Sequence, residues 1–385
     1  MDKKFTLNLP LKVILTETGT SHFLNANKKL LRFKLADNTE EYGISLSPFS
    51  PQSIQNMILV DYISKIEISM SDFVSVRQEV MDLSKVIVYS VLYKQFDRQV
   101  FSEIIKCDCV KKHNRVNPAQ IIDERTRISD VQLRLFLARQ DAAIQAARKS
   151  ILDSLWQSIM DNKEFSPEEK NIYLLMTEKF LNRLSLMNWY IIIRFYRAAG
   201  FAEMTAVIRR LLAKYMDKSK VAEYISILVM ELALSSETTN LRQEAKNMYP
   251  DVVNIDTLIF DPEARAKIVA EMSRKHRQVF LSWKLGGSSA AIGKQGRLQV
   301  MLYNHDDEFQ EVKELIESKS ASDLNRKSLI DFYREIPEAE RGTDLGMYYF
   351  SYLDEACKKV NVKFESVVNQ FSSGGLMVIS LNFNF

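Results

Sequence analysis

The middle of the chain limits the fold more than any other feature of the sequence, because it has to be helical. Residues 132–160 are rich in Ala, Leu, Arg and Gln and contain neither Gly nor Pro, which predicts one helix or two closely joined helices. Ser166, Pro167 and Glu169 follow, and they supply the N-cap hydroxyl, first-position proline and third-position carboxylate of a helix start. The sequence therefore predicts a helical bundle between less helical ends.

An apolar stripe continues beyond this helix start. Apolar side chains recur at steps of three and four at Tyr173, Met176, Phe180, Leu184, Met187, Ile191 and Phe195. Gly200 follows and predicts the end of this helix. A stripe of this length has to be buried against other helices of the chain or against a second copy, so this connector could form a homodimer.

The first seventy residues have the pattern of β-strands. Apolar residues of one parity run from Phe5 to Leu15, and further β-rich runs lie at 30–35, 41–47 and 63–70. The same pattern returns after residue 250. Two runs at 279–285 and 296–304 predict a hairpin, and runs at 362–368 and 376–385 predict two closing strands. Between these pairs, polar residues 305–341 predict helices near 308–317 and 327–334.

Two segments near the N-terminus allow a second interpretation. Lys3 and Lys4 precede an apolar stretch, as in a signal peptide, but Pro10 and Lys12 interrupt that stretch and favour a strand. Within residues 71–116, the run VIVYSVLY fits either a strand or a buried helix, and we favour the helix.

Charge and cysteine content restrict the partners and the compartment. The 52 basic and 49 acidic residues nearly cancel, so no overall field favours nucleic acid. Three cysteines do not make a disulfide framework and indicate a reducing compartment. Cys107, Cys109 and His113 lack a fourth ligand, so we expect no metal site there. The apolar run at 184–195 is too short for a membrane, which needs roughly 20 residues. We expect a cytoplasmic protein without membrane insertion.

These patterns predict an α+β chain of three parts, because 385 residues exceed one ordinary core. They are a small β-rich domain over 1–116, a helical connector over 117–214, and an α/β sandwich over 215–385.

Three segments of the last part carry residues suited to nucleotide chemistry. Glu231 and Ser235 lie four residues apart, which places them on one face of a helix. Asn304 and Asp306 follow the second strand of the predicted hairpin. Gly342, Asp344 and Gly346 form a turn that opens a helix, where backbone N–H groups can bind phosphate.

In this order, residues 215–385 resemble the GHKL ATP-binding domain of histidine kinases and anti-sigma-factor kinases. The resemblance implies that Glu231 would orient water or a hydroxyl and that Ser235 stands where an asparagine binds Mg²⁺. It places Asn304 or Asp306 at the adenine-reading aspartate. It places Gly342 and Gly346 in the phosphate turn.

The sequence departs from the family pattern at the positions that matter for ATP. Ser235 replaces the asparagine, the glycines beside Asn304 are absent, and Asp344 puts a negative charge in place of the middle glycine. Each residue also has a plain structural interpretation. Glu231 could be a solvated helix charge, Asn304 the start of a polar turn, and Asp344 a helix N-cap.

The sequence therefore predicts a signalling or regulatory protein whose degenerate GHKL-type domain binds no cofactor and contacts partner proteins. The alternatives are an active ATP-dependent histidine- or serine-kinase-type enzyme that uses Mg-ATP, and a helical scaffold with chance similarity to that family.

Overall fold

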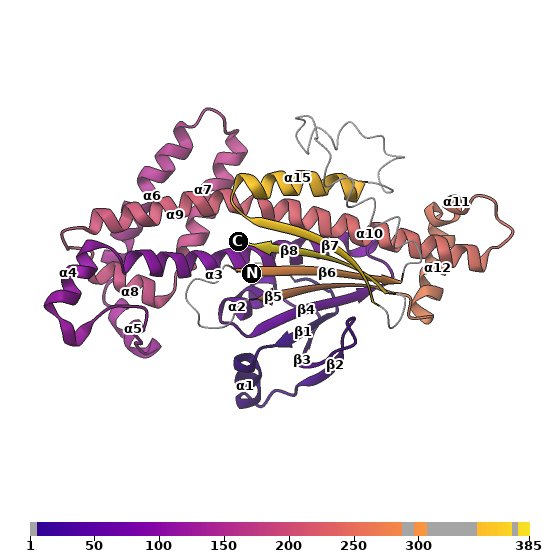
Figure 1. Ribbon diagram of the computed structural model, residues 1–385, viewed down its shortest axis with the longest axis horizontal. Coiled ribbons are helices and arrows are strands. Elements are labelled where there is room, and N and C mark those ends of the chain that lie inside the picture. Colours follow the sequence, from indigo (N-terminus) through magenta and orange to yellow (C-terminus); the bar gives the residue numbers. More distant parts are fainter. Residues whose placement is uncertain (1–5, 287–295, 306–344, 372–375) are drawn as a thin grey trace. The chain divides into compact units, whose positions relative to one another are not determined.

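The computed structural model describes residues 6–286, 296–305, 345–371 and 376–385 (Figure 1). The chain divides into two compact units. The first combines Met1–Val91 with Val221–Phe385, and the second is Leu92–Lys220. The long helix α3 (Arg77–Ile104) contributes residues to both.

The strands of the first unit form one eight-stranded antiparallel sheet, in the order β2-β3-β1-β4-β5-β6-β8-β7. They are β1 (Leu11–Leu15), β2 (Leu31–Lys34), β3 (Glu40–Leu46), β4 (Ile63–Met70), β5 (Val279–Gly286), β6 (Arg297–His305), β7 (Lys363–Phe371) and β8 (Leu376–Asn384). The β4–β5 pair joins the N-terminal strands to the C-terminal ones, with Ile66 opposite Trp283. Strands from the two ends of the sequence therefore share one sheet.

The described part of the first unit also contains helices. They are α1 (Glu17–Asn25), α2 (Pro51–Leu59), the short 3₁₀ helix η1 (Val74–Val76), the start of α3, α10 (Val221–Met248), α11 (Ile255–Phe260), α12 (Pro262–Arg274) and α15 (Leu345–Lys359). Helix α10 packs on β5 and β6, and α15 packs on both α10 and β7.

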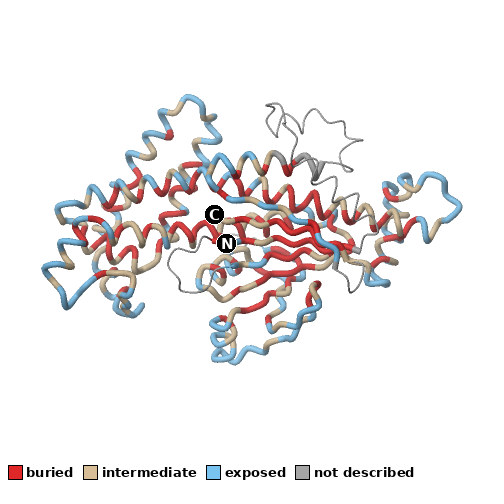
Figure 2. The backbone as a smooth tube through the Cα atoms, viewed as in Figure 1, coloured by how far each residue is buried: buried red, intermediate tan, exposed pale blue. Residues whose placement is uncertain are grey.

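One face of the sheet is apolar and lies against α10. Asn304 of β6 bonds to α10, so the residues of the same parity, Leu298, Val300 and Leu302, face that helix too. The matching residues of β8 are Met377, Ile379, Leu381 and Phe383, all buried (Figure 2). The closing strand that the sequence predicted over 376–385 is confirmed as β8.

The opposite face of the sheet holds paired charges. The buried Glu67 of β4 accepts a hydrogen bond from the Ala36 backbone N–H at 3.1 Å and lies 3.0 Å from the Lys12 ammonium. Ala36, which follows β2, also packs against Met301 and Tyr303. The segment after β2 therefore closes over this face.

The second unit is helical. Besides the end of α3, it contains α4 (Asp108–Val116), the short 3₁₀ helix η2 (Pro118–Gln120), α5 (Asp130–Leu137), α6 (Asp141–Asp161), α7 (Pro167–Asn182), α8 (Leu186–Arg194) and α9 (Phe201–Ser219). The predicted capping box of Ser166 and Glu169 is present at the start of α7. Phe96, Phe180 and Tyr215 meet edge to face, with ring centroids 5.3 to 5.8 Å apart. Aromatic packing therefore joins α3, α7 and α9.

The predicted single helix from Tyr173 to Phe195 is two helices. Helix α7 ends at Asn182, and Ser185 caps α8 by accepting a hydrogen bond from the Asn188 N–H. The Asp97 carboxylate accepts two further bonds there, each 2.6 Å long, from the Ser185 N–H and the Asn188 amide. Hydrogen bonds to Asp97 of α3 thus stabilise the start of α8. The regular spacing of apolar residues gave no sign of this helix start.

The chain is also grouped differently from the three parts that the sequence predicted. The predicted 1–116 and 215–385 domains share one sheet, and the helical unit begins inside α3 at Leu92. The stripe is buried largely within its own chain, because Tyr173, Phe180 and Ile191 are all buried. Its burial therefore does not need a second copy. Over the ranges given above, no helix combines the length and apolar character needed to cross a bilayer.

We expect Ile191→Ala to lower the free energy of unfolding by roughly 2–5 kcal/mol, because it leaves a cavity in the core of the helical unit. Ile172→Ala is the control, since Ile172 is 57% exposed on α7 and should cost well under 1 kcal/mol. Urea unfolding followed by circular dichroism measures both. A change in sedimentation with Ile191→Ala at unchanged stability would instead place the stripe in an interface between copies.

Candidate functional site

Helix α10 carries polar side chains into the interior. Its buried residues are spread around the helix, so other parts of the protein cover α10 on most sides. Its buried polar residues include Glu231, Ser236, Glu237, Asn240 and Glu244. Buried polar groups need partners, and these partners define the candidate site.

Glu231 is held by a cation. Its carboxylate lies 2.7 Å from the Arg77 guanidinium at the start of α3, and the Glu231 side chain is only 8% exposed. Burial raises the pKa of Glu231, and the charge of Arg77 partly offsets that effect. A carboxylate bound in this way is a weaker acceptor for any further ligand.

Asn304 joins the sheet to α10. The Asn240 amide donates to the Asn304 side-chain oxygen at 2.8 Å, and the Asn304 amide donates to the Ser236 carbonyl at 3.4 Å. Both asparagines are buried. The end of β6 is therefore tied to the turn of α10 that follows Ser235.

Glu237 ties α10 to two other segments. Its carboxylate pairs with Arg265 of α12 and accepts the Phe73 backbone N–H after β4. Arg265 also lies 3.0 Å from the Asp72 carboxylate. One turn of α10 is thus bonded to elements far apart in the sequence.

Glu244, close to the C-terminal end of α10, is fully buried and faces two cations. The Lys275 ammonium lies 2.7 Å from one carboxylate oxygen, and the Arg277 guanidinium lies 3.7 Å from the other. Both cations follow α12, so Glu244 fixes the start of β5 against the helix.

Four of the seven candidate residues lie in described segments. Glu231 is buried, Ser235 is half-buried one turn later, and Asn304 bonds to the next turn. Gly346 lies in α15, which packs on α10. The remaining candidates, Asp306, Gly342 and Asp344, lie outside the described residues, as do the helices predicted near 308–317 and 327–334. The structure bonds Asn304 to the turn of α10 that follows Ser235 and packs α15 on the same helix, whereas Glu231 pairs with Arg77.

Sequence reasoning missed Asn240 and the cations Arg77 and Arg265. A signal for Asn240 existed, because Glu237, Asn240 and Glu244 recur at steps of three and four in a helix that is otherwise largely apolar. No local signal marked the cations, since their partners lie about 150 and 28 positions away along the chain.

The cysteines are not arranged as metal ligands. Burial raises the pKa of Cys107 to about 12, and it also raises the pKa of Cys109, so both remain thiols near neutral pH. The His113 ring bonds to the Gln120 carbonyl at 3.2 Å. Within the part of the chain that the structure describes, no three His, Cys, Asp or Glu residues are grouped to hold a metal ion.

The hydrogen bond between Asn240 and Asn304 can be tested by replacing each side chain alone and both together. We expect Asn240→Leu and Asn304→Leu each to lower the free energy of unfolding by roughly 1–3 kcal/mol, because each leaves a buried amide without its partner. The double variant should cost less than the sum of the two, since it removes both amides. Urea unfolding of all four proteins measures the coupling. Strict additivity would show that the two side chains do not interact.

Comparison with known proteins places this architecture in a family. A family model described as a family of unknown function, DUF8084, matches residues 2–385. An uncharacterized protein of Treponema pallidum (strain Nichols) is 37% identical over 384 residues, covering 100% of this chain and 99% of the relative. No solved structure matches the chain. The chain therefore belongs to the DUF8084 family.

Proposed function

We propose that this protein is a signalling or regulatory protein in which residues 221–385 of the predicted 215–385 domain supply a degenerate GHKL-type part of the first unit, whose sheet they share with the N-terminal strands. In this proposal the domain no longer binds ATP productively and works through contact with partner proteins. The order of elements supports it: helix α10, strands β5 and β6, helix α15 and strands β7 and β8 occur in this order, with α11 and α12 between α10 and β5, and α10 and α15 pack on the sheet.

One observation carries the proposal. The two best-placed candidates for nucleotide chemistry are already bonded within the protein, Glu231 to Arg77 and Asn304 to Asn240. In an ATP site, the carboxylate and the base-reading group have to face the ligand. Here side chains of the same unit take those positions, which favours a packed interior over a nucleotide pocket.

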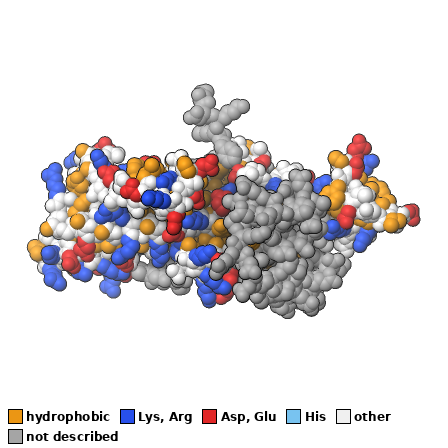
Figure 3. Space-filling view, turned by 90° about the horizontal axis from the view of Figure 1, so that it is seen from above, with side chains coloured by type: hydrophobic (Ala, Val, Ile, Leu, Met, Phe, Trp, Pro, Cys, Tyr) orange, Lys and Arg blue, Asp and Glu red, His pale blue; other side chains and the backbone are white. Residues whose placement is uncertain are grey.

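An exposed apolar patch supports the protein-contact part of the proposal. Val252, Val253 and Phe260 lie at the end of the first unit that carries α11, and Phe260 is 78% exposed. Figure 3 shows hydrophobic side chains gathered at this end. Apolar surface that is left in water commonly marks a protein contact.

The test is a thermal melt with and without Mg-ATP at millimolar concentration. We expect no shift for the natural protein. A protein that bound ATP at a hundredfold excess over Kd would gain about 2.7 kcal/mol, which moves the melting midpoint by several degrees.

Three variants localise any binding. Ser235→Asn with Asp344→Gly restores the family residues and should create or strengthen a shift if the pocket kept its shape. Thr239→Asn with Asp344→Gly is the matched control, because it places the asparagine one turn further along α10. A shift of the natural protein that Glu231→Gln reduces would contradict the proposal and favour the ATP-dependent kinase.

A further inference from the structure

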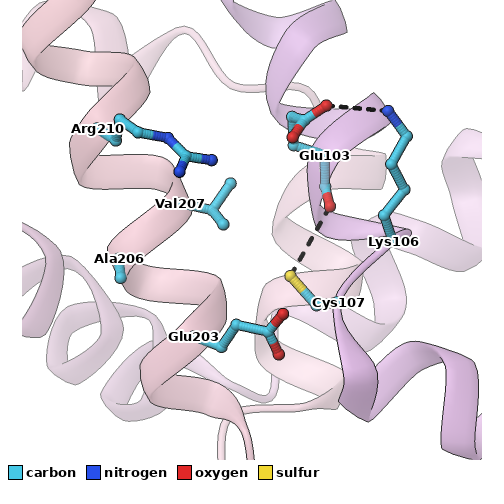
Figure 4. Close-up of a pocket in the computed structure, with 7 residues that line it drawn as sticks. All are labelled: Glu103, Lys106, Cys107, Glu203, Ala206, Val207 and Arg210. Atoms are coloured by element: carbon cyan, nitrogen blue, oxygen red, sulfur yellow. Dashed lines mark hydrogen bonds and ion pairs between the residues drawn. The ribbon is translucent and has the colours of Figure 1, made fainter.

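A groove runs between α3 and α9, entirely within the helical unit. It consists of two adjoining pockets of about 380 and 390 Å³ that share Glu103 and Arg210. Figure 4 shows the first pocket, with Glu103, Lys106 and Cys107 on the α3 side and Val207 and Arg210 on α9. Leu211 and Lys214 of α9, with Gln99 and Ser102 of α3, line the second. Each pocket is within the size range of small-molecule sites.

The acids of the groove have partners, and two of its cations do not. The Glu103 carboxylate lies 2.9 Å from the Lys106 ammonium, and Glu203 accepts the Asp108 backbone N–H at 3.1 Å. Arg210 and Lys214 sit one turn apart on α9. Both side chains are exposed, and across the described ranges neither side chain makes an ion pair or a hydrogen bond.

Lys218 is a third cation on α9, and unlike Arg210 and Lys214 it is buried. Lys218 follows Lys214 by one turn and is only 2% exposed, and its charge lies over the Tyr215 ring at 5.3 Å. Burial and the charge of Lys214 lower the pKa of Lys218 to about 8. Among the residues that the structure describes, Lys218 has no acidic partner, although buried charges are normally paired. Within the described part of the chain, Arg210, Lys214 and Lys218 therefore follow one another along α9 without a direct ion pair, although Glu103 and Glu203 also line the groove.

We propose that the groove between α3 and α9 binds the phosphate group of a small organic molecule. The Arg210 guanidinium and the Lys214 ammonium hold the phosphate oxygens, because two unpaired cations one turn apart match the charge of a phosphate monoester better than that of a carboxylate. Ser102 and Gln99 offer neutral hydrogen bonds from the facing helix. Val207 and Leu211 give an apolar floor to the rest of the ligand.

This site is separate from the α10 contacts of the first unit, so it does not depend on the proposed function. Arg210 and Lys214 belong to the helical unit, whereas Glu231 belongs to the other. The two proposals can therefore fail independently.

The experiment titrates the full-length protein with phenyl phosphate and measures binding by calorimetry. Benzoate and inorganic phosphate are the comparison ligands, since one carries a single charge and the other lacks an apolar body. We expect phenyl phosphate to bind at least tenfold more tightly than either. Binding of benzoate with equal affinity would overturn the assignment to phosphate.

Four variants test the residues. Arg210→Gln and Lys214→Gln should each weaken phenyl phosphate binding by about tenfold, because each removes a charge-assisted hydrogen bond. Glu103→Gln should leave binding unchanged or strengthen it, and Lys179→Gln, exposed on α7 outside the groove, should have no effect. Unchanged circular dichroism spectra show that the variants fold. No measurable binding, or binding that survives both α9 variants, would overturn the proposal.

Discussion

The pairing of buried acids on α10 is the constraint on which the first unit depends. A helix that is covered on most sides cannot leave Glu231, Glu237 or Glu244 without a cation, because an unpaired buried carboxylate costs several kcal/mol. Each cation comes from a different place: Arg77 from α3, Arg265 from α12, and Lys275 with Arg277 from the approach to β5. Pairing the buried carboxylates of α10 with these cations therefore fixes where the start of α3, α12 and the sheet have to lie.

This arrangement also relates the fold to its functional proposals. In the first unit, the polar side chains that the sequence predicted for a nucleotide site are bonded to the protein itself, as with Asn304 and Asn240. In the second unit, Arg210 and Lys214 are exposed and Lys218 is buried, and among the residues that the structure describes none of the three has an acidic partner. A buried charge requires a counter-charge, as the acids of α10 show, whereas the exposed cations of α9 stay in water and are accessible to an anionic ligand.

Individual elements were predictable wherever the signal was local. The pairing of β5 with β6, the closing strand β8 and the capping box at Ser166 depend on neighbouring residues, and all are confirmed. The break between α7 and α8 was missed, because Ser185 acts as a cap only with Asp97 of α3 beside it. For the candidate site, sequence spacing identified Glu231 and Ser235 on one helix face, but it could not show that Arg77 occupies the Glu231 carboxylate.

The sequence by itself determined the type and approximate limits of most elements, since hydrophobic period, caps and turn residues act over a few positions. Only the tertiary structure decided that the first and last strands share one sheet, because β4 pairs with β5 across more than two hundred residues of chain. Local patterns specify which face of a strand is apolar, not which strand lies beside it. The same holds for the buried acids of α10: the sequence shows the charge, and only the fold shows which distant cation neutralises it.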